Sequence, residues 1–205
     1  MMPGISMRLP LTILLPLCLG LALPAAAVAQ KRQAGTGFTL MKDGTLIHRA
    51  SKTRFPMQLA GFTRARANAF DAKGHDIAIS YSRTIAGKPV VARIALIHIV
   101  GLTPKEHVLS LKPVIGTYFR DLNLRSIRPQ SEGPVDLPGF KPGSAYQARS
   151  RAVVGKTPYE VSLTAVNFDY WDARLTAAYP HAVAPQAQKS IFDLVAELRK
   201  TGPKR

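Results

Sequence analysis

The chain has 205 residues, of which 46% are hydrophobic and 20% charged, a composition that excludes an intrinsically disordered protein. Its 28 Lys and Arg oppose 12 Asp and Glu, which gives a formal net charge of +16. A long apolar tract occurs only at the N-terminus, which excludes a bundle of membrane-spanning helices. One Cys and five scattered His exclude a disulfide scaffold and argue against a zinc module.

Residues 1–29 have the pattern of a cleavable secretory signal peptide. Arg8 supplies the positive start, residues 9–23 form an apolar run, and Ala27 and Ala29 offer the small side chains that favour cleavage after Ala29. The alternative is a membrane anchor, but about 15 apolar residues are too few to span a core of ~30 Å. Cleavage would remove Arg8 and leave a net charge of +15. The alanine-rich site is typical of bacterial export, so we expect a periplasmic or secreted protein.

Cys18 lies inside this apolar run and raises the alternative of a lipoprotein. Lipid attachment favours a small residue just before the cysteine, and here Leu17 precedes it. We therefore expect Cys18 to be discarded with the signal peptide. The mature chain would then contain no disulfide, thiol nucleophile or thiolate metal ligand.

The first half of the mature chain predicts a flexible lead-in followed by an antiparallel meander. Residues 30–37 are polar and glycine-bearing, as a loose terminal segment is. Residues 38–41 and 45–49 flank a turn at Gly44 and predict a small hairpin. Three longer strands joined by short turns are predicted at residues 62–70, 76–84 and 90–100.

The second half predicts a helix, a second meander and a terminal helix. Thr103 and Glu106 have the spacing of a capping box that begins a helix, and Pro113 predicts a kink or break in it. Residues 126–145 contain four prolines and predict a long surface connection. Three strands and an amphipathic helix are then predicted at residues 146–154, 159–168, 171–179 and 185–201.

These elements predict one α+β domain over residues 38–201, followed by a C-terminal tail at 202–205. We expect an antiparallel sheet of about six strands in two meanders, with two helices packed on one face. The element order, with a late strand that ends in Ala-Ala-Tyr-Pro at 177–180, resembles the PsbP-like α/β domains and their DcrB-type periplasmic relatives. The resemblance implies a small binding or assembly-support domain rather than an enzyme, and it transfers no functional residue.

Catalytic and metal-binding patterns are weak in this sequence. The chain contains no G-x-S-x-G, H-E-x-x-H, EF-hand, P-loop or G-x-G-x-x-G pattern, so we expect no metal site, no nucleotide and no other cofactor. The alternative is a hydrolase-type enzyme whose site is built from dispersed His and Asp residues. The residues that this alternative would draw on are His48, His75, His98, His107, His181, Asp71, Asp76 and Asp169.

Basic charge is the remaining functional indication. Ten Lys and Arg lie between Gly44 and Lys105, where only Asp71 and Asp76 oppose them. Side chains two positions apart on a strand share a face, so arginine pairs on two strands predict an arginine-rich sheet face. The predicted anion-binding residues are Arg64, Arg66, Arg83, Arg93, Arg149 and Arg151.

Such a face would attract anionic lipid headgroups, lipopolysaccharide phosphates or an acidic protein, with an affinity that falls as salt rises. The alternative is a solvated sheet face that Glu160 and Asp172 partly neutralise. Export and the lack of a recognisable binding signature argue against nucleic acid as the partner. The sequence therefore predicts an exported, non-catalytic binding or envelope-support protein.

Overall fold

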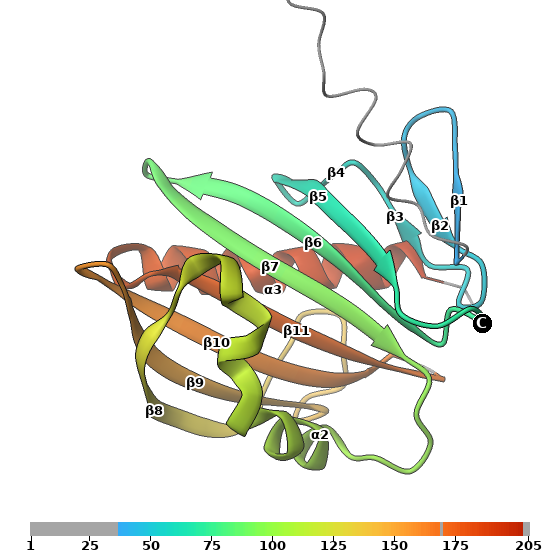
Figure 1. Ribbon diagram of the computed structural model, residues 1–205. Helices are drawn as coiled ribbons and strands as arrows, with labels where there is room; N and C mark the ends of the chain where they lie inside the picture. The colour runs from blue at the N-terminus through green and yellow to red at the C-terminus, as the bar shows by residue number, and fades with distance from the viewer. Residues whose placement is uncertain (1–36, 169, 203–205) are drawn as a thin grey trace, which may run out of the picture.

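The computed structural model describes residues 37–168 and 170–202 (Figure 1). The predicted signal peptide and residues 30–36 of the predicted lead-in lie outside these ranges, and Gly202 is the one residue of the predicted tail inside them. The strands are β1 (Phe38–Leu40), β2 (Leu46–His48), β3 (Arg54–Phe55), β4 (Gln58–Leu59), β5 (Phe62–Ala69), β6 (Asp76–Ile85), β7 (Lys88–Ile97), β8 (Arg125–Val135), β9 (Ala145–Val154), β10 (Thr157–Phe168) and β11 (Trp171–Pro180). The helical segments are α2 (Pro104–Leu111), η1 (Lys112–Leu122), η2 (His181–Val183) and α3 (Ala184–Thr201).

One large antiparallel sheet organises the molecule. Its eight strands follow the order β4-β5-β6-β7-β11-β10-β9-β8, and β1, β2 and β3 form a separate small sheet. The two predicted meanders, β5-β6-β7 and β9-β10-β11, join where β7 pairs antiparallel with β11, with Leu96 opposite Ala173. The predicted α+β class and antiparallel sheet are confirmed.

Strand β8 replaces much of the connection that was predicted at residues 126–145. It is 11 residues long and pairs with β9, with register shifts on both sides of Arg128 and Pro129. The prolines led to the prediction of a loop, but β8 is the terminal strand of the sheet. Proline is tolerated on such a strand because one of its edges makes no ladder hydrogen bonds.

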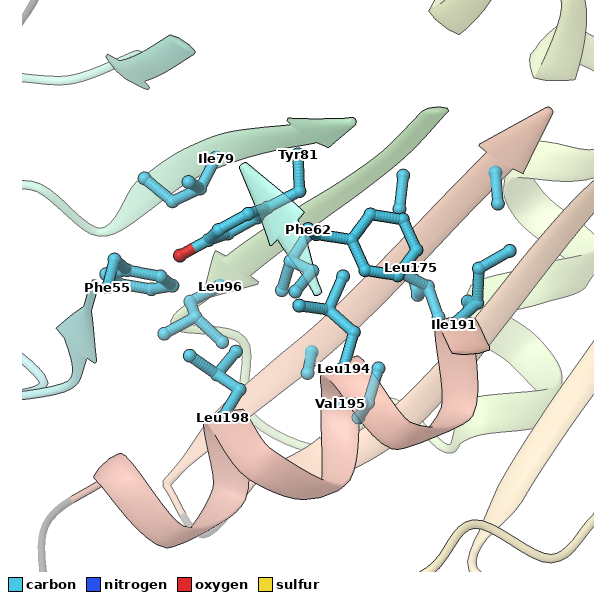
Figure 2. Packing of buried hydrophobic residues seen from close by; sticks show 14 of the residues in the cluster. Phe55, Phe62, Ile79, Tyr81, Leu96, Leu175, Ile191, Leu194, Val195 and Leu198 are labelled. Atoms are coloured by element: carbon cyan, nitrogen blue, oxygen red, sulfur yellow. The ribbon is translucent and has the colours of Figure 1, made fainter. Parts of the chain in front are cut away.

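Helix α3 covers one face of the sheet. Ile191, Leu194 and Leu198 lie on its buried side, and Figure 2 shows them pointing toward the sheet. They belong to the same buried cluster as Phe62 and Tyr81, both fully buried. The C-terminal amphipathic helix thus closes the larger of the two apolar cores.

Segments α2 and η1 pack against the opposite face, over β9 and β10. Val108 and Ile115 from these segments share a buried cluster with Val161 and Leu163 of β10, while Val166 of the same strand belongs to the α3 cluster. In Figure 1, α3 lies behind the sheet and α2 in front of it. The helices therefore divide between the two faces, which refines the predicted single layer. The physical reason is that β10 is buried on both sides.

The predicted start and break of the first helix are both confirmed. The backbone N–H of Glu106 donates to Thr103 Oγ1 at 3.2 Å, and the Glu106 carboxylate accepts from the Thr103 N–H at 2.9 Å. The α-helix ends at Leu111, and the 3-10 segment that contains Pro113 follows it. In the part of the chain that the structure describes, no helix is long and apolar enough to cross a membrane.

Candidate functional site

A β-bulge separates the first predicted arginine pair. In the pairing of β5 with β6, Arg64 lies opposite Tyr81 and Arg66 lies opposite Ser80, so Ala65 is an extra residue. Arg64 consequently faces the α3 side of the sheet with Tyr81, and Arg66 faces the α2 side. The prediction that these two side chains share a face is wrong, because the inserted residue shifts the alternation.

Arg64 is a buried structural residue. Its side chain is 8% exposed, and its guanidinium donates to the carbonyl oxygen of Phe55 and, at 2.7 Å, to that of Gly44. Burial lowers the pKa of this guanidinium. The contacts tie β5 to the small sheet, so Arg64 is not presented to an anionic ligand.

Arg83 is also engaged within the fold. Its Nη1 donates to the carbonyl oxygen of Ala60 at 3.2 Å and to Ser190 Oγ of α3 at 3.3 Å. The guanidinium carbon lies 5.9 Å from the centre of the Phe62 ring, a cation–π distance. Arg83 therefore holds β6 against α3 rather than lining an open basic face.

Arg66 and Arg93 do share a face, on the α2 side of the sheet. Ser80 of β6 pairs with Arg66 on one side and with Arg93 of β7 on the other. Arg66 is exposed and Arg93 is half-buried. Among the described residues, neither forms a salt bridge with a carboxylate.

Arg149 and Arg151 lie on β9, which β7, β11 and β10 separate from β6. They share the α3-side face with Ser162 and Glu160, their partners on β10. The six predicted arginines therefore do not form a single surface. Two are structural, two lie on the α2 side, and two lie near the far edge of the opposite face.

Two further arginines join this far edge from β8. Arg128 lies directly opposite Arg151, and Arg125 lies opposite Val153. Arg125, Arg128 and Arg151 are all exposed. We name Arg125, Arg128, Arg149 and Arg151 the basic edge. The sequence prediction missed Arg128 because residues 126–145, which contain four prolines, were interpreted as a connection, and it missed Arg125 because that residue was assigned to no strand.

The acidic residue nearest to the basic edge is Glu160, and its carboxylate already has two partners. Glu160 is 1% exposed, and its carboxylate accepts from Arg149 Nη2 at 2.6 Å and lies 2.8 Å from His181 Nδ1. This arrangement neutralises Arg149. Within the described residues, Arg125, Arg128 and Arg151 have no acidic partner within salt-bridge distance, so the basic edge carries uncompensated positive charge.

Among the described residues, no histidine is placed as a general base that would activate a nucleophile in a recognised way. His181 contacts Glu160, but the structure gives it no hydroxyl partner among the described residues. His48 Nδ1 lies 2.7 Å from Ser51 Oγ, yet both residues are buried, and His48 Nε2 donates to the carbonyl oxygen of Gly74 instead of a carboxylate. The hydrolase alternative therefore gains no observation in its favour.

The other dispersed residues have local roles. The rings of His75 and His98 lie 5.4 Å apart between centres, tilted by 41°, beside Trp171. Asp71 accepts backbone hydrogen bonds within its own turn. Asp169 lies outside the described residues. Across residues 37–168 and 170–202, no group of three or more His, Cys, Asp or Glu could hold a metal ion.

Comparison with known proteins identifies no family. No protein-family model matches the chain, and no curated protein matches its sequence. Among solved structures, the chain is similar to the 1.9 Å crystal structure of the Saccharomyces cerevisiae Ran-binding protein Mog1p, with 13% sequence identity and a TM-score of 0.35. The match covers 74% of this chain and 88% of that one. A similarity this weak supports no inference about function, and the PsbP-like resemblance is not confirmed.

Proposed function

We propose that this protein is an exported, non-catalytic binding protein of the bacterial envelope, and that it contacts an acidic protein through the basic edge. The observation that carries the proposal is the exposed pair Arg128 and Arg151, which lie directly opposite each other. Like charges in this cross-strand position are destabilising. An acidic partner would remove that repulsion. The residue pattern at 1–29 supports the envelope as the location.

The position of the basic edge also favours contact with a partner. Strand β8 ends the sheet, and α3 reaches β9 at Gln147, which accepts a hydrogen bond from Gln188 at 3.5 Å. Arg125, Arg128 and Arg151 nevertheless stay exposed at this end of the face. Exposed charges act over a Debye length of roughly 8–10 Å at physiological salt, so binding should weaken as salt rises.

The proposal is tested by measuring how the purified mature chain binds fluorescent poly-L-glutamate, by anisotropy, in a salt series. We expect the double variant Arg128→Ala/Arg151→Ala to bind at least tenfold more weakly than the native chain. The matched control is Lys42→Ala/Lys88→Ala, which removes two exposed charges elsewhere and should keep most of the affinity. Equal losses in both variants would mean that net charge alone drives binding, and would overturn the proposal.

A parallel experiment distinguishes an acidic protein partner from an anionic lipid partner. Vesicles of phosphatidylglycerol and vesicles that contain lipopolysaccharide replace poly-L-glutamate as the probe. Binding to vesicles without binding to poly-L-glutamate would replace the protein partner with a lipid one.

Mass spectrometry of the full chain after expression in a bacterium should show a mature protein that begins at Gln30.

A further inference from the structure

A group of polar side chains on the α2 side of the sheet has buried atoms without hydrogen-bond partners. Buried polar atoms are nearly always paired, so several unpaired ones on one face need an explanation. They come from the neighbouring strands β6, β7 and β11 and from α2. The unpaired atoms are Asp76 Oδ1, Arg93 Nε, His107 Nδ1, Asp172 Oδ2 and Thr176 Oγ1.

The sheet register places the strand residues on one face. Arg93 lies opposite Thr176, and both Asp76 and Asp172 lie opposite Ile97. Asp172, Arg174 and Thr176 alternate along β11, so they point the same way. This is the α2 side of the sheet, the opposite face from the basic edge.

Three of these residues are more than nine-tenths buried. Thr176 is 1% exposed, His107 is 3% exposed and Asp172 is 5% exposed. Burial, together with the charge of Arg174, lowers the pKa of His107 to about 4, so its ring is neutral at pH 7. Burial raises the pKa of both Asp76 and Asp172.

Two aromatic rings hold the arginines of this group. The guanidinium carbon of Arg174 lies 4.9 Å from the centre of the Tyr118 ring, and that of Arg93 lies 5.9 Å from the same ring. Arg93 also lies 5.4 Å from the Phe70 ring. These cation–π contacts hold both guanidinium groups beside the rings without satisfying their N–H donors.

Arg93 and Arg174 lack an ion-pair partner, whereas Arg66 beside them is exposed to solvent. Asp76 and Asp172 lie at the register of Ile97, four positions along β7 from Arg93. Within the described residues, none of these arginines lies within 4.0 Å of a carboxylate oxygen, the limit for an ion pair. A buried unpaired charge is costly, so an anion bound by Arg93 and Arg174 would stabilise the group.

We infer that this group is a binding site for a small organic acid, whose carboxylate or phosphate contacts Arg93 and Arg174. Thr176 and His107 supply further hydrogen bonds to the oxyanion. Arg66 and Phe70, which lie beside Arg93 on the β5 side, are exposed. The site is independent of the basic edge and of the partner proposed for it.

The test titrates the purified mature chain with glycolate, glycine, acetate and inorganic phosphate, with sodium chloride at equal ionic strength as the reference. The readouts are the Tm and the Arg93 Nε–H resonance in a ¹⁵N correlation spectrum. We expect glycolate, glycine or acetate to raise the Tm and move this resonance more than sodium chloride does. A greater effect of phosphate would assign the oxyanion as phosphate. If none of the four exceeds sodium chloride, the inference is wrong.

Variants then locate the bound anion. Arg93→Lys keeps the charge but lacks Nε, and Thr176→Val keeps the shape but lacks the hydroxyl. We expect the former to weaken binding at least tenfold and the latter several-fold, while Arg128→Ala/Arg151→Ala binds as the native chain does. If only the last variant loses binding, the anion occupies the basic edge and the site on the α2 side does not exist. Far-UV circular dichroism of each variant verifies that it is folded.

Discussion

Arg64 and Arg66 are only two residues apart, yet one belongs to the interior and the other to the surface. The bulge at Ala65 sends Arg64 toward two backbone carbonyl groups and Arg66 toward Ser80 and Arg93. A carbonyl that loses a charged donor in a buried place is left unsatisfied. Arg64 therefore contributes to stability, whereas Arg66 is available for binding.

We expect Arg64→Ala to lower the free energy of unfolding by about 2–3 kcal/mol, because two buried carbonyl groups lose a charged hydrogen-bond donor. The measurement is urea denaturation followed by circular dichroism. Arg66→Ala removes the same side chain from an exposed position and should change stability by less than about 0.5 kcal/mol. Equal effects of the two substitutions would contradict the assigned difference.

At the scale of single elements, α2 buries a polar side chain as well as an apolar one. Val108 packs into the core, while the neighbouring His107 is buried above Arg174 with Nδ1 unpaired. Protonation of this ring would place a second positive charge beside Arg174. The docking of α2 on the sheet is therefore sensitive to pH.

We expect stability to fall as the pH falls from about 6.5 to about 4, because the unfolded chain takes up the His107 proton at the ordinary pKa and the folded chain only near 4. The lowered pKa corresponds to roughly 3 kcal/mol across this window, and none of that loss arises above it. Comparison of His107→Gln with the native chain by urea denaturation at pH 7 and pH 4 measures it. Parallel pH profiles of the two proteins would show that His107 is not the source.

At the scale of the whole molecule, α3 connects parts of the chain that are distant in sequence. It contacts β11 in the middle of the large sheet, β4 at its edge and β3 in the small sheet. Near its end, Thr201 Oγ1 donates to the carbonyl oxygen of Arg54 at 2.8 Å. Both sheets are therefore stabilised by one helix.

We expect Leu194→Ala to lower the free energy of unfolding by about 2–5 kcal/mol, because it leaves a cavity at a fully buried position (Figure 2). Circular dichroism and Trp171 fluorescence should report a single coincident transition if both sheets unfold together. Leu109→Ala, at a position that is 39% exposed, should cost less than about 1 kcal/mol. Two separate transitions would show that the small sheet unfolds independently.

The sequence predicted well where the signal is local. The six long strands, the capping box at Thr103 and the amphipathic stripe of α3 are all visible in residue spacing. It failed at β8, whose prolines are acceptable only because that strand ends the sheet. It also failed at the arginine pair of β5, because one extra residue reverses the alternation.

By itself, the sequence determined the class of fold, the extended and helical segments and the excess of positive charge, since each of these follows from composition or from short-range periodicity. Only the tertiary structure decided which charges meet. The pairing of β7 with β11 brings Arg93 beside Thr176, and the pairing of β8 with β9 sets Arg128 against Arg151. Strand order and register depend on long-range contacts, so the positions of both proposed binding sites could not be derived from residue spacing alone.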